Sequence, residues 1–211
     1  NNKPSNRHDF IDLLLELREK GTIRGESIEK IDDNGRAIQI EMEMDFNCMV
    51  AQVLVFFAAG FETSSSATSY TLHQLALNPE EQEKIQDEID QVLVKYHNKI
   101  SYDSISEMTR LRMAFMEGFR MFPSLGTLHR VCARKYTIPE LDITIDPGVK
   151  IIIPVQAIQN DEKYFKSPSE FIPERFADIS DIQNKYSFLP FGEGPRMCIG
   201  ARLGEMQSLA G

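Results

Sequence analysis

The stretch FGEGPRMCIG, residues 191–200, places one cysteine in a glycine-rich turn directly before a helical pattern. The first N–H groups of a helix have no partner within it and lie at the positive end of its dipole, so a thiolate of Cys198 would be stabilised there. The thiolate is the form of cysteine that binds metal ions. Gly194 and Gly200 allow a flat, bulky group to approach the backbone closely, and the ring of Phe191 can cover the sulfur. The stretch therefore predicts a cofactor site at Cys198.

A haem meets these demands, because cysteine thiolate is the ligand that pushes electron density onto haem iron and favours O–O cleavage. Arg196 is a fixed cation that can pair with a carboxylate of the haem. The stretch resembles the haem-binding signature of the cytochromes P-450, Phe-x-x-Gly-x-Arg-x-Cys-x-Gly, at every defined position. The alternative is a structural cysteine in a Gly/Pro loop, since a free cysteine is usually a small buried hydrophobe. Further motifs in the family's order favour the haem site.

The segment from Ala59 to Ser64 lies where an apolar helical run becomes polar. Gly60 weakens a helix and the hydroxyl of Thr63 can bond to a carbonyl one turn back, so a local groove or kink can open. A carboxylate and a hydroxyl in such a groove can relay protons. The alternative is a Ser/Thr-rich helix whose hydroxyls bond to its own backbone. The segment resembles the distal-helix pattern of the cytochromes P-450, which implies that Thr63 steadies bound dioxygen and that Glu62 supports proton delivery.

Glu117 and Arg120 are spaced i, i+3 on one face of a predicted helix. As an exposed pair, which is the alternative, they would contribute only about 0–1 kcal/mol. Breaking a buried pair would cost roughly 3–5 kcal/mol. Residues 117–120 resemble the family's Glu-x-x-Arg, and residues 173–176 resemble its Pro-Glu-Arg-Phe. The resemblance implies that Glu117, Arg120 and Arg175 form a structural triad that locks the irregular segment against the helix.

Arg130 lies between this helix and the predicted strands. It can be an ordinary surface arginine, but its distance after the helix resembles that of a family arginine that pairs with a haem propionate. His129 can share this role or be exposed. Ser124 stands where many family members have a second proline after Phe122-Pro123, and we expect little consequence.

Composition and charge are those of a soluble globular protein: the chain of 211 residues is 42% hydrophobic and 26% charged. The net charge of -9 argues against nucleic-acid binding through phosphate neutralisation. The cysteines, Cys48, Cys132 and Cys198, are odd in number and far apart, and the histidines show no ligand-like spacing, so neither a disulfide framework nor a zinc site is predicted. A reducing compartment is the simplest fit.

The pattern is mainly α with a small β portion. Helices are predicted for the apolar stripe at 10–17 with a stop at Gly21, for 46–77, from Pro79 onward, and for 102–121. The apolar part of the second helix, residues 46–61, is too short to span a membrane and is expected to be buried in a large core. Residues 21–40 predict an exposed loop with a turn at 32–35. Strand signals begin near Tyr136. Residues 143–153 predict a hairpin around Pro147-Gly148, and residues 160–190 predict an irregular meander.

The resemblance implies the C-terminal half of a cytochrome P-450 fold in one partial domain. Its helical part would span about 1–125, its small β portion and meander 126–187, and its cysteine loop with the following helix 188–211. Haem b would be the cofactor. The reaction would be the O2- and NADPH-dependent insertion of one oxygen atom into an apolar small molecule (xenobiotic, lipid or hormone-like). Phe57, Ala58 and Phe61 are candidate wall residues, with ordinary helix packing as the alternative.

NADPH-cytochrome P-450 reductase is the implied electron donor, and the resemblance also allows cytochrome b5 as a partner. Residues 8–21 and 51–65 look most like the insect microsomal, xenobiotic-handling branch. The whole protein would therefore sit on the cytosolic face of the endoplasmic reticulum membrane through an N-terminal anchor missing here. The chain has no Trp, so the family's Trp-x-x-x-Arg contact to a propionate is also missing, and we expect this fragment alone to be inactive.

Two alternatives remain at this point. One is a haem-thiolate isomerase or dehydratase, which needs no external electrons, although the intact Glu62-Thr63 pair counts against it. The other is a helical module that binds no haem.

Overall fold

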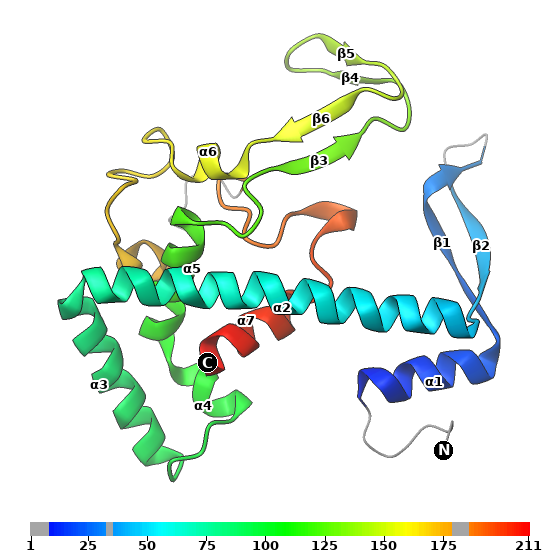
Figure 1. Cartoon of the computed structure of the whole chain (residues 1–211). Coiled ribbons are helices and arrows are strands. Elements are labelled where there is room, and N and C mark those ends of the chain that lie inside the picture. The colour runs from blue at the N-terminus through cyan, green and yellow to red at the C-terminus, as the bar shows by residue number, and fades with distance from the viewer. Residues whose placement is uncertain (1–8, 33–35, 179–185) are drawn as a thin grey trace. The chain divides into compact units, whose positions relative to one another are not determined.

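The computed structural model describes residues 9–32, 36–178 and 186–211. They fall into two compact units, up to Ala59 and from Gly60 onward, which are considered separately. The described elements follow one another along the chain (Figure 1) in this order: α1 Phe10–Lys20, β1 Thr22–Ile31, β2 Ala37–Glu43, α2 Phe46–Leu77, α3 Pro79–Lys95, α4 Tyr102–Glu107, α5 Thr109–Met121, β3 Leu128–Val131, β4 Tyr136–Ile138, β5 Ile143–Ile145, β6 Lys150–Ile153, α6 Val155–Gln159, η1 Pro173–Phe176, η3 Gly194–Arg196 and α7 Ala201–Ala210. The mainly helical class with a small β portion is confirmed.

In the first unit, α1 begins and ends as its sequence predicts. Asp9 caps it by accepting a hydrogen bond from the backbone N–H of Asp12 at 3.0 Å. Gly21 ends it with a φ of 77° and donates its N–H to the carbonyl of Arg18. A positive φ is adopted readily only by glycine, so the predicted stop is confirmed.

The prediction of an exposed loop over residues 21–40 is wrong, because β1 and β2 form an antiparallel hairpin there. Thr22 pairs with Glu43 and Gly25 with Ile40. The signal was the alternation of Ile38, Ile40 and Met42 with polar residues, which has the period of a strand. The polar composition hid it, and the side chains of β2 are indeed exposed along its whole length. Residues 33–35 of the predicted turn lie outside the described residues.

The predicted second helix is confirmed as α2, which extends without a break to Leu77. Its first half is not buried as expected: Phe46, Leu54, Phe57 and Phe61 are 62–73% exposed. Within the first unit, α1 contacts this part of α2 through Phe10 on Phe56 and Arg18 on Phe46, and within the second unit α2 has buried residues from Ser64 onward. By length and composition alone α2 could also cross a membrane, a test that core helices of soluble proteins pass as well.

In the second unit, the helix predicted over 102–121 is two helices, α4 and α5, that part at Met108. The carboxylate of Glu88, from α3, causes the restart. It accepts hydrogen bonds from the backbone N–H groups of Arg110 at 2.9 Å and Leu111 at 3.0 Å, and from the hydroxyl of Thr109 at 3.1 Å. Free N–H groups at a helix start need such acceptors, and here a distant helix supplies them.

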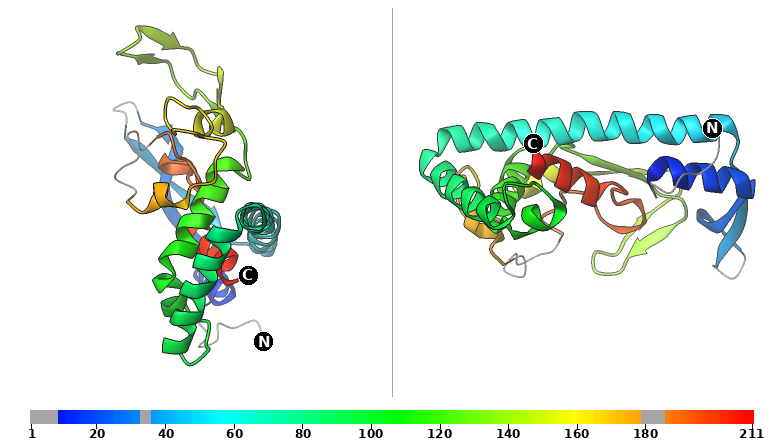
Figure 2. Two further views of the ribbon diagram at one scale, coloured as in Figure 1. Left: turned by 90° about the vertical axis from the view of Figure 1, so that its left-hand side faces the viewer. Right: turned by 90° about the horizontal axis from the view of Figure 1, so that it is seen from below.

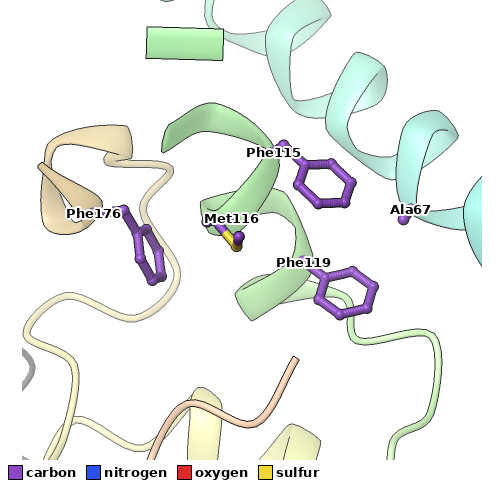
Figure 3. Close-up of a cluster of buried hydrophobic side chains, with 5 residues drawn as sticks. All are labelled: Ala67, Phe115, Met116, Phe119 and Phe176. Carbon is purple, nitrogen blue, oxygen red and sulfur yellow. The ribbon is translucent and has the colours of Figure 1, made fainter. Parts of the chain in front are cut away.

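Helix α5 is the centre of the second unit, and every residue from Ala114 to Met121 is buried. Figure 3 shows Phe115 and Phe119 of α5 facing Ala67 of α2, with Phe176 of η1 on the other side of the helix. The helices α2 and α5 touch closely at Gly118, where an added Cβ would lie 2.6 Å from Thr71 Oγ1 and 3.2 Å from its Cα.

We expect Gly118→Ala to destabilise the full-length protein by about 1–3 kcal/mol, because a methyl group at this contact forces two packed helices apart. Intrinsic helix propensity acts the other way, by about 0.5–1 kcal/mol. The urea midpoint measures the net effect. Gly204→Ala is the matched control, since its Cβ would meet Ser64 Oγ at an ordinary 3.8 Å. Equal midpoints for both variants would contradict the close contact of α2 with α5.

The predicted hairpin over residues 143–153 is wrong in its pairing. The turn itself forms, with Gly148 at a φ of 85° and the N–H of Val149 donating to the carbonyl of Asp146. However, β5 pairs with β4 and β6 pairs with β3, so the turn joins strands of different sheets. The missed element is β3, whose four residues LHRV carry too weak a strand signal. The described part of the predicted meander is irregular apart from the short η1.

Candidate functional site

Cys198 lies in the turn between η3 and α7, two residues before Gly200, which precedes the first turn of α7. Its backbone N–H donates to the carbonyl of Phe191 at 2.8 Å and so closes the loop. Gly192 and Gly194 have φ values of 74° and 79°, a conformation that a residue with a Cβ adopts only with strain. The glycines of the motif are therefore needed to bring the cysteine to the start of the helix.

The surroundings of Cys198 fit a haem. Its side chain is exposed, and a Cβ added at Gly194 would meet nothing within 4 Å. The flanking side chains are apolar and open: Met197 is 52%, Ile199 87% and Leu203 62% exposed. An accessible thiol beside open space and apolar side chains suits the flat, largely apolar face of a porphyrin.

The loop is attached to the buried core at its first residues. The ring of Phe191 lies 5.6 Å from the ring of Phe119, which belongs to the core cluster of α5. Two residues earlier, the N–H of Leu189 donates to the side-chain oxygen of Gln159 at 2.9 Å. The position of the cysteine thus depends on the packing of α5 and α6.

Helix α7 carries the loop to the polar half of α2 (Figures 1 and 2). Small residues meet at the crossing, where an added Cβ at Gly204 would lie 3.8 Å from Ser64 Oγ. The Ser208 hydroxyl donates to the Ser64 carbonyl, and the Thr68 hydroxyl donates to the Ser208 carbonyl, both at 3.5 Å. The helix that follows Cys198 is therefore docked on α2 at Ser64 and Thr68, and Ser64 directly follows Glu62 and Thr63 in the chain.

Glu62 is exposed and Thr63 is half-buried on α2. The helix continues through Gly60, so the weak point opens no break in it. The alternative, hydroxyls bonded to the helix backbone, occurs at Ser65, whose hydroxyl donates to the carbonyls of Phe61 at 2.8 Å and Glu62 at 3.2 Å. The carbonyl of Thr63 accepts a hydrogen bond from Ser124 Oγ at 3.2 Å. Ser124, expected to be of little consequence, thus joins the end of α5 to the candidate catalytic segment.

The side chains of Glu117, Arg120 and Arg175 meet in the core. Arg120 donates from Nε to Glu117 Oε2 at 2.7 Å and from Nη2 to Oε1 at 3.0 Å, and both residues are fully buried. Arg175 donates from Nε to Glu117 Oε1 at 3.2 Å. A two-point contact between guanidinium and carboxylate is strong and fixes orientation.

The same three side chains hold the irregular segment through its backbone. Arg120 donates to the carbonyls of Gln159 and Pro168 at 2.8 Å each, and Arg175 donates to that of Ser167 at 2.9 Å. Glu117 accepts the N–H of Ile172 at 3.0 Å. The segment has almost no regular secondary structure, so these side chains supply the hydrogen bonds that a strand or helix would otherwise provide.

Arg130 is half-buried on β3, and its Nη1 donates to the carbonyl of the exposed His129 at 2.9 Å. Leu128 points to the same face of the strand as Arg130, and an added Cβ at Gly192 would lie 3.8 Å from it. This face of β3 therefore meets the cysteine loop. Arg196 is exposed on η3, two residues before the cysteine.

Sequence reasoning missed Gln159 and Glu88, both of which form buried or half-buried hydrogen bonds between distant segments. Neither belongs to a recognisable pattern. Apart from the Thr109 hydroxyl on Glu88, the partners named here are backbone atoms, which carry no sequence signal, so only the fold reveals them.

Comparison with known proteins identifies relatives along the whole chain. The family model described as cytochrome P-450 matches residues 1–210. "Cytochrome P-450 6B6" of Helicoverpa armigera is 38% identical over 211 residues, which are 99% of this chain and 40% of the relative. "Probable cytochrome P-450 6a13" of Drosophila melanogaster is 40% identical over 206 residues, 97% of this chain and 38% of the relative. The chain spans about two fifths of the length of the curated relatives it matches.

Proposed function

Since this chain belongs to the cytochrome P-450 family, we propose that it forms the haem-thiolate part of a monooxygenase. One arrangement carries the proposal. The exposed Cys198 precedes α7, and α7 is docked on α2 at Ser64, the residue that follows Glu62 and Thr63. One helix crossing would thereby hold the metal-binding thiolate near the segment with the proton-relaying pair.

Haem b, when bound, would supply the iron at which dioxygen is reduced and its O–O bond cleaved. Cys198 Sγ would bind the iron, and Phe191 would shield the sulfur from water. The guanidinium groups of Arg196 and Arg130 would pair with the haem carboxylates. The hydroxyl of Thr63 and the carboxylate of Glu62 would hold and pass on the protons that the reaction consumes.

The apolar half of α2 supports a proposal for the substrate class. Phe57 and Phe61 lie one turn apart on the same face and are 73% and 65% exposed. We infer that such rings contact an apolar small molecule, a xenobiotic, lipid or hormone-like compound, into which one oxygen atom is inserted. NADPH would supply the electrons through cytochrome P-450 reductase, with cytochrome b5 as a second donor. The protein would act at the cytosolic face of the endoplasmic reticulum membrane, where an N-terminal anchor would hold it.

The test uses the full-length protein, purified with haem and reconstituted with reductase. A thiolate-type spectrum of the reduced CO complex, together with product formation that requires NADPH and O2, is the expected result. Product formation that continues without NADPH would favour the isomerase or dehydratase class. A protein that takes up no haem would leave only the helical module.

Thr63→Ala should separate oxygen chemistry from binding. Haem content and substrate affinity should stay near those of the wild type. Product formed per NADPH should fall roughly hundredfold, the lower end of what a positioned proton donor contributes, while hydrogen peroxide rises. Ser65→Ala is the matched control, because its hydroxyl bonds only to backbone carbonyls in the described contacts. Normal coupling of NADPH use to product in Thr63→Ala would reduce Thr63 to a packing residue.

A further inference from the structure

Gln159, the last residue of α6, is fully buried, and its side chain joins three segments. Its Nε2 donates to the carbonyls of Arg120 at 3.1 Å and Phe119 at 3.4 Å. Its Oε1 accepts the N–H of Leu189 at 2.9 Å. A buried amide is costly to leave unpaired. The side chain of Gln159 avoids this cost because both its nitrogen and its oxygen are hydrogen-bonded.

On one side, Gln159 completes the end of α5. The last carbonyls of a helix have no partner within it, and those of Phe119 and Arg120 lie in the last turn. The contact is reciprocal, because Arg120 Nη1 donates to the backbone carbonyl of Gln159 at 2.8 Å. Gln159 is therefore bonded directly to the buried network of Glu117, Arg120 and Arg175.

On the other side, Gln159 holds the entry to the cysteine loop. Leu189 stands two residues before Phe191, and the carbonyl of Phe191 accepts the N–H of Cys198 at 2.8 Å. Two hydrogen bonds and the three residues from Leu189 to Phe191 thus separate the Gln159 amide from the cysteine. The ring contact between Phe191 and Phe119 is a second connection between the loop and α5.

We propose that Gln159 is a positioning residue for the thiolate: it ties the cysteine loop to the buried network and so fixes where Cys198 stands. The part of this proposal that concerns iron ligation rests on the proposed function. Most of the loop, from Glu193 to Ile199, is exposed, so its buried attachment lies at its entry. Without the amide, α5 can keep its core packing while the loop entry loses its hydrogen bond.

The experiment compares two variants of the full-length protein by hydrogen exchange of the backbone amides. Gln159→Met fills the same volume but offers no acceptor, so the Leu189 amide should exchange about tenfold or more faster, as expected for a lost buried hydrogen bond. Gln159→Glu keeps an acceptor for Leu189 and should restore its protection even if α5 is weakened. Ser104→Ala is the control, because Ser104 is equally buried but its hydroxyl donates to the carbonyl of Ser101, the N-cap of α4.

The second measurement is the rate at which the reduced CO complex loses its thiolate-type spectrum. Gln159→Met should lose this spectrum faster than Ser104→Ala when each variant is held the same number of degrees below its own thermal unfolding midpoint. Equal Leu189 exchange in Gln159→Met, Gln159→Glu and Ser104→Ala would overturn the proposal. A wild-type protein without a thiolate-type spectrum would count against the proposed function instead, and the exchange comparison would still decide whether Gln159 holds the loop.

Discussion

Replacing Cys198 by alanine in the full-length protein should abolish the thiolate-type spectrum of the reduced CO complex and with it all NADPH-dependent product formation. The reason is the ligand itself, because alanine offers no donor atom and the thiolate drives O–O cleavage. Cys198 is exposed just before α7, whereas Cys132 directly follows β3 and its thiol donates to the carbonyl of Arg134 at 2.8 Å.

The controls are Cys48→Ala and Cys132→Ala, which should keep the spectrum. Absorption of the reduced CO complex, normalised to haem content, is the measurement. An unchanged spectrum in the Cys198 variant, or its loss in either control, would show that the axial ligand has been assigned to the wrong residue.

The second large effect is expected from Glu117→Gln. The neutral amide would leave Arg120 fully buried and Arg175 largely buried without their counter-charge. Removing one member of a buried ion pair costs about 3–5 kcal/mol. A domain is stable by only about 5–15 kcal/mol, so much of the protein should fail to fold and load haem.

The matched control is Arg112→Gln, which breaks the exposed pair of Arg112 with Glu205 between α5 and α7. An exposed pair is worth about 0–1 kcal/mol, so this variant should stay near wild type. Urea midpoints and haem content per protein distinguish the two. Equal shifts in both variants would mean that the buried network stabilises no more than a surface pair does.

The parts of the fold that could be predicted depend on local signals. Gly21 needs a positive φ, and Pro79 suits the first turn of a helix, so the end of α1 and the start of α3 were predictable. The break at Met108 was not, because it depends on Glu88 of another helix. The pairing of β6 with β3 was also hidden, since strand partners are chosen by long-range contacts rather than by the turn at Gly148.

The residues of the candidate site also fall into a predictable group and an unpredictable one. Its chemical residues follow from motifs, because a thiol, a carboxylate and a hydroxyl cannot be replaced without losing their chemistry. The residues that hold these chemical groups in place do not follow from motifs. Gln159 and Ser124 act on backbone atoms of residues 30 and 61 positions away. Many side chains can satisfy such atoms, so the sequence alone gives no reason to select these two.

The crossing of α2 with α7 also has a consequence for biosynthesis. Thr68 and Ser208, which meet there, are 140 residues apart in the chain. At a synthesis rate of about 5–20 residues per second, the α2 segment leaves the ribosome roughly 7–28 s before the segment that completes this contact. Helix α7 and the polar half of α2 therefore come together late in translation, and this surface of α2 must stay available for docking until then.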